Sequence, residues 1–295
     1  MKNKIVIAGG TGFIGKYLTK KYRELGYTVI IISRNAGNNQ VKWEDTTELI
    51  KAINQSKLLI NLSGKSVDCR YTEKNKWKIL SSRTSTTLRL HDIIKQCEQA
   101  PEMWINSSTA TIYRHAEDKP MTEQDGELGT GFSVQVGRTW ESVFFNEKHE
   151  NVKQVALRTA IVLGDGSAFK PLKVLAKIGL GGPQGHGKQK FSWIHIEDLF
   201  GIIRYIQQHN KPKCIYNCSS PNPTSNVELM HLVRKHHGRK WYIPTPTYLL
   251  KIGAFFIRTE TELVLKSRWV IPKNLMDDNF QFKYLKLESA IKSLP

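Results

Sequence analysis

The chain has 295 residues, of which 40% are hydrophobic and 24% charged, as is typical of a globular protein. Its 21 glycines, 11 prolines and 4 cysteines exclude collagen-like, low-complexity and disulfide-scaffold classes. The formal net charge of +18 is uneven, with 24 basic against 18 acidic residues up to Asp165 and 20 against 8 after it. This excess favours an anionic partner, but the basic residues are scattered, so a solvated basic surface is the simpler explanation.

No segment has the length of a membrane span. The apolar run Tyr248–Ile257 contains Lys251 and is far shorter than the roughly 20 residues required. The N-terminus has Lys2 and Lys4, then a short apolar run and a glycine-rich turn, without a cleavage pattern. We therefore expect a cytoplasmic protein with free thiols and no membrane partner.

The first 32 residues predict a βαβ unit. Lys4–Ala8 is a short β-branched run, typical of a buried strand, and a glycine-rich turn follows it. Phe13–Leu25 has helical spacing of apolar residues, and Tyr27–Ile32 is a second strand. Two strands joined by a helix of this length should be parallel, with a right-handed crossover.

Strands and helices continue to alternate up to Leu163, which predicts a Rossmann-type, doubly wound α/β sheet. The expected helices are Leu49–Gln55, Asn75–Gln99 and Trp140–Lys148, and the expected strands are Leu58–Leu62, Met103–Asn106, Gln154–Leu157 and Ile161–Leu163.

The pattern weakens after Leu163. Gly179–Gly187 holds five glycines and predicts loops, whereas Ile194–Ile196 and Ile215–Asn217 predict strands that return to the sheet. Amphipathic stretches follow at Glu228–His236 and Tyr248–Ile257. We therefore expect a nucleotide-binding domain over residues 1–165, with return segments near 191–220. A small C-terminal substrate-side domain would span 221–295, with 166–190 contributing.

The segment Gly9–Gly15 has the glycine spacing of a dinucleotide-binding turn, and it lies between a strand and a helix. In that context Gly9 allows the tight turn, Gly12 lets a pyrophosphate approach the backbone, and Gly15 allows close packing of helix on strand. The helix N-terminus then offers N–H groups and a positive dipole end to phosphates. A glycine-rich turn without a ligand is the less favoured alternative.

Ser33 and Arg34 follow the second predicted strand, where an acidic residue would bind the adenosine ribose of NAD(H). Arg34 cannot accept a hydrogen bond but can pair with a 2′-phosphate, and Ser33 adds a hydroxyl. This pair favours NADP(H) over NAD(H), although an arginine at a strand end is also an ordinary surface residue.

An ordered set of motifs resembles the extended short-chain dehydrogenase/reductase superfamily and, more narrowly, its atypical NAD(P)-dependent epimerase/dehydratase-like family. The resemblance covers essentially the whole chain. Its motifs are the glycine turn, Ser33-Arg34, Asn61–Gly64, Ser82–Thr87, Trp140-Glu141, Leu157–Gly164, Leu180–Pro183, Ser192–Leu199, Pro221–Asn226 and Val270–Pro272.

The resemblance implies an NADP-binding Rossmann domain and a small C-terminal substrate domain. By family position, Leu62, Ser63 and Gly64 would line the nicotinamide side of the cleft. Arg83 would face the cofactor pocket, and Val162 would lie close to the nicotinamide. The candidate cofactor-binding residues are therefore Gly9, Thr11, Gly12, Phe13, Ile14, Gly15, Ser33, Arg34, Leu62, Ser63, Gly64, Arg83 and Val162.

The usual catalytic pair of the superfamily, a Tyr with a Lys four residues later, is missing. The one such spacing, Tyr17 to Lys21, lies in the first predicted helix. The expected positions, counted from Trp140-Glu141, hold Ser133 and Gly137.

A hydroxyl position is retained, because Thr109 matches the Ser or Thr of the family. Tyr113 could present a phenol from the same loop. Thr109 and Tyr113 are thus the catalytic candidates, and loop hydroxyls that satisfy backbone groups are the alternative of similar weight.

Two histidines are further candidates for a functional role. His186 lies in a glycine loop that could reach the cleft, whereas the strand position of His195 predicts a structural residue. We expect no metal, because His236-His237 lacks nearby acidic or Cys ligands.

These observations predict an NADP(H)-binding, epimerase-like or oxidoreductase protein. Its substrate would be a small molecule, such as a nucleotide sugar, and the positive charge favours an anionic one. The alternative is a non-catalytic NADP(H)-dependent sensor or partner-binding protein, which the missing Tyr and Lys favour. Specific nucleic-acid binding is not expected, because only charge supports it and no recognition motif occurs.

Overall fold

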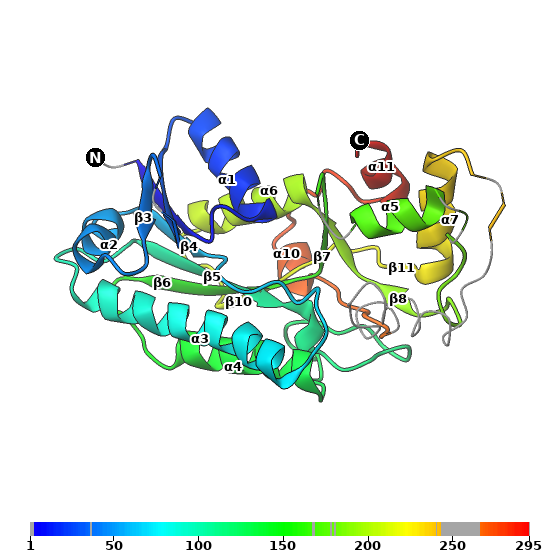
Figure 1. Cartoon of the computed structure of the whole chain (residues 1–295), viewed down its shortest axis with the longest axis horizontal. Helices are drawn as coiled ribbons and strands as arrows, with labels where there is room; N and C mark the ends of the chain where they lie inside the picture. Colours follow the sequence, from blue (N-terminus) through cyan, green and yellow to red (C-terminus); the bar gives the residue numbers. More distant parts are fainter. Residues whose placement is uncertain are drawn as a thin grey trace.

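The structure is a computed structural model that describes residues 3–35, 37–166, 169–177, 179, 181–239, 241–242 and 266–294. Its main body is a seven-stranded sheet in the order β10-β6-β5-β4-β1-β2-β3, in which every pairing is parallel (Figure 1). The strands are β1 Lys4–Ala8, β2 Thr28–Ser33, β3 Gln40–Lys42, β4 Leu58–Asn61, β5 Met103–Thr109, β6 Lys153–Thr159 and β10 Ile215–Cys218. This topology confirms the predicted doubly wound fold.

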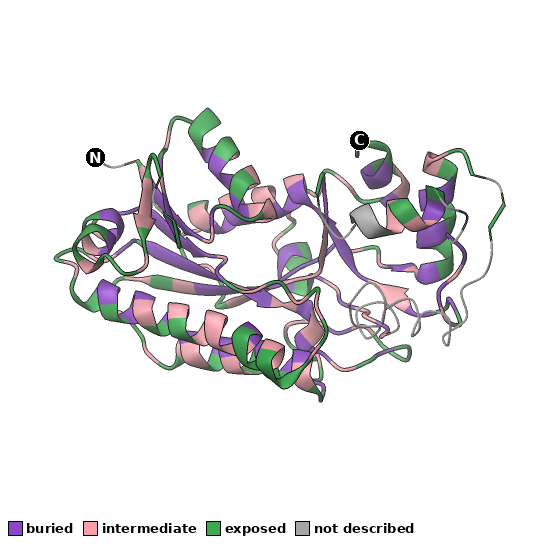
Figure 2. Cartoon of the chain, viewed as in Figure 1, coloured by how far each residue is buried: buried purple, intermediate pink, exposed green. Residues whose placement is uncertain are grey.

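Strands that are apolar on both faces explain why this sheet is covered on both sides. In β1, Ile5 and Ile7 belong to one core cluster, whereas Val6 and Ala8 belong to a second cluster on the opposite face. All four side chains are fully buried, and Figure 2 shows that the central strands of the sheet are mostly buried. Successive residues of a strand point to opposite faces, so an unbroken apolar run requires helices on both sides.

Helices supply those two layers (Figure 1). α1 (Phe13–Glu24) and α6 (Ile196–Gln208) pack on the face of Ile5 and Ile7. α2 (Thr46–Ile53), α3 (Glu73–Lys95) and α4 (Phe132–Phe145) cover the other face. Because α1, α3 and α4 follow parallel strands, their N-termini all lie at the carboxyl edge of the sheet.

A second, smaller core lies beside the main sheet. It combines β7 (Ile161–Leu163) and β9 (Trp193–His195) with α5 (Phe169–Lys177), α7 (Asn226–His236) and α11 (Leu287–Lys292), around the fully buried Trp193. β8 (Lys190–Phe191) pairs with β11 (Thr224–Ser225) in the same region. α10 (Lys273–Asp277) instead packs against β10 of the main sheet, so the chain crosses back after the second core.

The structure corrects the predicted elements at four places. β5 continues to Thr109, so the hydroxyls expected in a loop stand on the strand. β9 ends at His195 and pairs with β7 in a separate two-stranded sheet, not with the main sheet as predicted. α5 and the short strand β3 occupy segments for which no element was predicted. The predicted amphipathic stretch Tyr248–Ile257 lies outside the described residues.

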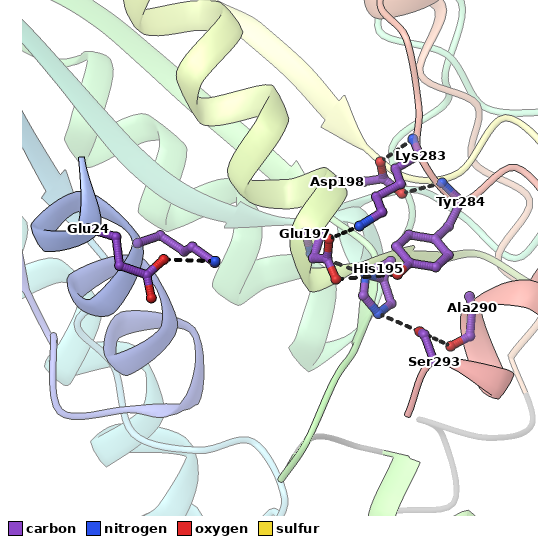
Figure 3. Close-up of polar contacts among 9 residues, drawn as sticks. Glu24, His195, Glu197, Asp198, Lys283, Tyr284, Ala290 and Ser293 are labelled. Atoms are coloured by element: carbon purple, nitrogen blue, oxygen red, sulfur yellow. Dashed lines mark hydrogen bonds and ion pairs between the residues drawn. The ribbon is translucent and has the colours of Figure 1, made fainter. Parts of the chain in front are cut away.

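His195 joins the two cores at the start of α6 (Figure 3). Its Nδ1 accepts the backbone N–H of Glu197, its Nε2 lies 3.2 Å from Ser293 Oγ, and its ring packs on Tyr284. Burial lowers the pKa of His195 to about 4. The predicted structural role of this histidine is confirmed by these contacts.

The next residues of α6 hold the C-terminal segment in place. The two carboxylate oxygens of Asp198 accept the backbone N–H groups of Lys283 and Tyr284 (Figure 3). Glu197 binds the Lys283 ammonium and the Tyr284 hydroxyl. Polar contacts at the start of α6 therefore connect the main sheet to Lys283 and Tyr284, near the end of the chain.

We predict that the contacts of His195 at the start of α6 weaken in mild acid. The unfolded chain protonates His195 near the ordinary histidine pKa of 6.5, whereas burial in the folded chain lowers this pKa to about 4. The contribution of the neutral imidazole to the free energy of unfolding is complete above pH 6.5, and it declines as the pH falls to 4, by at most about 3 kcal/mol.

The variant His195→Asn tests this prediction, because it keeps a good N-cap without a titrating ring. Its unfolding free energy, measured in urea at several pH values, should fall less steeply over this range. Equal slopes for the two proteins would contradict the assignment.

Candidate functional site

The strand order reverses between β1 and β4, which is where doubly wound sheets bind ligands beyond their carboxyl ends. The turn after β1 and the loop after β4 meet there. A Cβ added at Gly9 would lie 2.9 Å from the backbone carbon and oxygen of Leu62 and 3.1 Å from the nitrogen of Ser63. Only a residue without a side chain permits this approach. Gly9 therefore sets the distance between the two walls of the candidate site, which are the turn after β1 and the loop after β4.

Packing within the protein also requires a glycine at position 15. A Cβ at this position would stand 2.5 Å from the Cα of Gly10 and 2.6 Å from the carbonyl oxygen of Gly9. The first turn of α1 therefore lies directly on the glycine turn, as close helix–strand packing requires.

Gly12 differs from its neighbours, because nothing in the described protein excludes a side chain there. The nearest atom to an added Cβ is the carbonyl oxygen of Gly9, at an ordinary 3.5 Å. Its backbone, with φ of −75° and ψ of 175°, is extended and open to any residue. Neither strain nor packing explains a glycine at this position, whereas close approach of a ligand to the backbone does.

The N-terminus of α1 offers free donors beside Gly12. Gly12 is the N-cap, no side chain caps the helix, and the first turn has no acidic residue. The first N–H groups of a helix have no intrahelical partners and carry a partial positive charge. Together with Gly12, this helix end can bind an anionic group such as a diphosphate.

Three of the predicted site residues pack on the same core cluster from different elements: Ile14 from α1, Leu62 after β4, and Val162 in β7. Phe13 also contacts this region, because a Cβ at Gly164 would lie 2.6 Å from its ring. The structure thus brings the helix start, the β4 loop and β7 together at the carboxyl edge.

Ser63 stands on the wall that faces the glycine turn. Its N–H donates to Asn61 Oδ1, and the Asn61 side-chain amide donates to Asn106 on β5, so the end of β4 is fixed. Ser63 is 7% exposed, yet its Oγ has no hydrogen-bond partner among the described residues. Buried hydroxyls usually have a partner, so this oxygen is suited to a ligand between the walls.

Arg83, on α3, packs directly on Gly64, where an added Cβ would lie 2.9 Å from the guanidinium carbon. Its Nη1 donates to the carbonyl oxygens of Lys65 and Ile79, and the guanidinium lies over the Trp140 ring. Burial lowers the pKa of Arg83 to about 10. The side chain therefore supports the β4 loop, in addition to any contact with a ligand.

Ser33 and Arg34 end β2 next to the glycine turn, where the N–H of Gly9 donates to the Ile32 carbonyl. Ser33 is buried, and its Oγ donates to the carbonyl oxygen of Asn35 and lies 3.1 Å from Gln40 Oε1. Arg34 is exposed, so its charge is available to a ligand at this edge.

Thr109 lies two strands away from the turn, at the end of β5, and is partly exposed. Its Oγ1 accepts the N–H of Thr111 and lies 2.8 Å from Thr111 Oγ1. Gly137, the position predicted for the catalytic lysine, packs against Thr109. A Cβ at Gly137 would stand 3.0 Å from the methyl group of Thr109 and 3.3 Å from Cβ of Ile112. A lysine could not enter this contact unless these residues moved.

Tyr113 is not presented from the loop, as the sequence suggested, but is 1% exposed. Its hydroxyl receives a hydrogen bond from Arg158 Nη1 and donates one to Asn217 Oδ1, both at 2.9 Å. Burial raises the pKa of Tyr113 above its ordinary value, against the opposing charge of Arg158. The phenol is therefore placed to hold structure rather than to exchange a proton at neutral pH.

A buried ion pair anchors this tyrosine. Glu141 on α4 accepts two hydrogen bonds from Arg158 on β6, each of 2.8 Å, and a third from Ser108 on β5. Burial alone would lower the pKa of Arg158, but the hydrogen bonds and charge of Glu141 raise it. The two charges satisfy each other and tie α4 to β6, whereas the hydrogen bond from Ser108 ties α4 to β5, the strand that carries Thr109.

Other candidates lie apart from the turn. His186 Nε2 approaches Glu117 Oε1 at 3.6 Å, and both side chains are exposed. No group of three or more His, Cys, Asp or Glu residues able to hold a metal occurs within the described ranges. No helix in those ranges is long and apolar enough to cross a bilayer.

Comparisons with known proteins agree with this geometry. Residues 5–219 match the NAD dependent epimerase/dehydratase family. The chain belongs to this family. Residues 245–294 match a domain of unknown function, DUF1731.

The matches to individual proteins extend over nearly the whole chain. The epimerase family protein YfhF of Bacillus subtilis is 30% identical and aligns with 98% of this chain and 97% of its own. A crystal structure of the human epimerase family protein SDR39U1 with NADPH has a TM-score of 0.89. It is 29% identical, and the match covers 98% of each chain. A nucleoside-diphosphate sugar epimerase of Corynebacterium glutamicum, with a TM-score of 0.77 at 24% identity, shares the fold over 99% of this chain and 57% of its own.

The buried chain of Glu141, Arg158, Tyr113 and Asn217 was not predicted. The motifs Trp140-Glu141 and Leu157-Arg158 did contain two of its members. A charged residue inside an apolar strand, such as Arg158 in β6, is the signal that could have revealed a buried partner.

Removal of the Tyr113 hydroxyl tests its structural role. In Tyr113→Phe, Arg158 loses an acceptor and Asn217 loses a donor inside the protein, so we expect a loss of about 1–3 kcal/mol in unfolding free energy. Urea titrations of wild type and variant measure this loss. A change smaller than about 0.5 kcal/mol would contradict a structural role.

Proposed function

We propose that the chain binds NADP(H) across the carboxyl ends of β1 and β4, with the pyrophosphate on the N-terminus of α1. The observation that carries this proposal is Gly12, because no atom of the described protein requires a glycine there. The open N–H groups at the start of α1 supply the positive pole. The unpartnered hydroxyl of Ser63 on the facing wall, for which the described residues offer no hydrogen-bond partner, supports a ligand between the two loops.

The preference for NADP(H) over NAD(H) rests on charge. No acidic residue follows β2, so nothing at Ser33 or Arg34 can accept hydrogen bonds from a ribose 2′-hydroxyl as a carboxylate does. The exposed guanidinium of Arg34 suits a 2′-phosphate. The human relative, crystallised with NADPH, supports the same choice.

For chemistry, we propose hydride exchange with a small-molecule substrate, of which a nucleotide sugar is one class. NADP(H), when bound, supplies or accepts the hydride. Thr109 is the hydroxyl on the chain that would orient the substrate oxygen from the end of β5. Because Tyr113 is enclosed and the positions expected for the tyrosine and lysine hold Ser133 and Gly137, water would carry the proton.

The second candidate is a non-catalytic NADP(H) sensor. One observation favours it: Gly137, at the position expected for the family lysine, packs tightly against Thr109 and Ile112, so a side chain there would require these residues to shift. A sensor needs the dinucleotide site but no proton relay. The two candidates therefore share the cofactor and differ in turnover.

Substitution of Gly12 tests dinucleotide binding. In Gly12→Ala the new methyl group fits the protein at 3.5 Å, so the melting temperature should stay within about 2 °C of wild type. The methyl group would meet the pyrophosphate, and we expect NADPH affinity in calorimetry to fall at least about tenfold, as a loss of about 1.4 kcal/mol gives.

Gly15→Ala is the matched control for an added methyl group that collides with the protein itself, because its Cβ would lie 2.5 Å from the glycine turn. It should lower stability by about 1–3 kcal/mol, as overpacking typically does. NADPH affinity that survives in Gly12→Ala would overturn the site. Wild-type affinities that are equal for NADPH and NADH would overturn the NADP(H) assignment.

The catalytic proposal is tested with Thr109→Val, which retains the shape of the side chain and removes the hydroxyl. Carbonyl compounds are first screened for NADPH consumption by the wild-type protein. We expect the variant to lose roughly tenfold or more in kcat, with NADPH affinity unchanged, because the hydroxyl faces substrate rather than cofactor. A wild-type rate in the variant excludes Thr109 from catalysis, and a screen without any substrate favours the sensor.

A further inference from the structure

A cavity of about 510 Å³ lies on the outer side of the glycine turn, away from the wall that carries Ser63. Four segments line it. The turn contributes Gly10 and Thr11, α1 contributes five residues, and Ile31 of β2 and Gln40 of β3 form the remaining wall. The proposal for NADP(H) through Gly12 and Arg34 does not use this cavity.

The wall formed by α1 is strongly basic. Lys16, Lys20 and Arg23 stand on successive turns of the helix, and all three line the cavity. One acidic residue, Glu24, is also present, but its carboxylate binds Lys21 at 2.9 Å and lies 3.9 Å from the ammonium of Lys20. Lys16 and Arg23 form no ion pair with any residue in the described part of the chain. The lining thus carries three cations against one carboxylate that is already paired.

The cavity adjoins both parts of the predicted adenosine site. At one end are Gly10 and Thr11 of the glycine turn. At the other end is Gln40, whose Oε1 lies 3.1 Å from the Ser33 hydroxyl, one residue before Arg34. Parallel pairing of Ile31 with Gln40 fixes β3 at this position. A group held between the turn and Arg34 would therefore face the basic wall of α1.

Thr19 adds a polar group to the same wall. It is 6% exposed, lines the cavity between Lys16 and Lys20, and its Oγ1 has no hydrogen-bond partner among the residues that the structure describes. Buried hydroxyls seldom remain unbonded. This wall therefore offers a hydroxyl as well as cations to an anion.

We propose that this cavity takes the 2′-phosphate of NADP(H) and that Lys16 is a specificity-determining residue that acts with Arg34. The inference rests on the proposed NADP(H) binding. Lys16 directly follows Gly15 in the first turn of α1, so it is the cation of the wall that lies nearest to the turn. Lys20 and Arg23, one and two turns further along, extend the positive field outward. A phosphate monoester carries close to two negative charges at pH 7, and a ribose hydroxyl carries none.

Calorimetry with NADPH and NADH tests the proposal on the full chain. Lys16→Ala should weaken NADPH binding by roughly three- to tenfold, the range expected for a partly exposed charge contact. NADH binding should remain within about twofold, because no charge then faces Lys16. The difference between wild type and variant should shrink as salt rises from low to about 0.5 M, since exposed charges are screened.

Lys148→Ala is the matched control. Lys148 is an equally exposed lysine beyond the C-terminal end of α4, at the opposite edge of the sheet, and its removal should leave both affinities unchanged. The double variant Lys16→Ala with Arg34→Ala should bind NADPH and NADH with nearly equal affinity. Arg34→Ala alone should retain part of the preference.

The outcomes separate this inference from the proposed function. If the wild type binds NADPH tightly and Lys16→Ala changes neither affinity, or weakens both equally, the specificity role of Lys16 is wrong while NADP(H) binding stands. If the wild type binds neither dinucleotide, the proposed function fails and this inference fails with it. Selective loss of NADPH affinity in Lys16→Ala, absent in Lys148→Ala, supports both.

Discussion

The contact between the turn after β1 and the loop after β4 is the constraint on which the site depends. Gly9 brings the carbonyl of Leu62 within 2.9 Å of where a side chain would begin, and Gly15 brings α1 down onto the same turn. These two contacts place the open N-terminus of α1 next to the gap between the turn and the loop. Any larger residue at either position would separate the walls that define the site, so the geometry is set by backbone packing and not by the ligand.

The main sheet could be predicted because its cause is local. Runs such as Ile5–Ala8 are apolar on both faces, and that pattern has few solutions other than a covered parallel sheet. The glycine turn was predictable for the same reason, since the spacing of its residues reflects contacts within one βαβ unit. The position of β9 was not, because a three-residue apolar strand pairs equally well with any free edge. Its pairing with β7 depends on Trp193 and on helices far away in sequence.

The residues of the candidate site show the same difference between features with a local cause and features that depend on distant parts of the chain. Gly12, Ser33 and Arg34 could be proposed from the sequence because the role expected of each rests on its own backbone or charge. Tyr113 could not be placed, since its enclosure depends on Arg158 and Asn217 from two other strands. The cations of α1 were also missed as a group. Their spacing is ordinary for the exposed side of a helix, and only the short strand β3, which supplies Gln40, turns that side into a cavity wall.

The packing around Gly137 constrains the chemistry in addition to the missing tyrosine. A Cβ at Gly137 would lie 3.0 Å from the methyl group of Thr109 and 3.3 Å from Cβ of Ile112, so a lysine there would require these neighbours to shift. Glu141 on α4 accepts hydrogen bonds from Arg158 on β6 and from Ser108 on β5, and these buried contacts hold α4 against both strands. Any proton transfer at Thr109 must therefore use solvent or the substrate itself. That restriction suits a substrate whose oxygen needs orientation more than acid–base assistance, and it is equally compatible with a site that binds the dinucleotide without turnover.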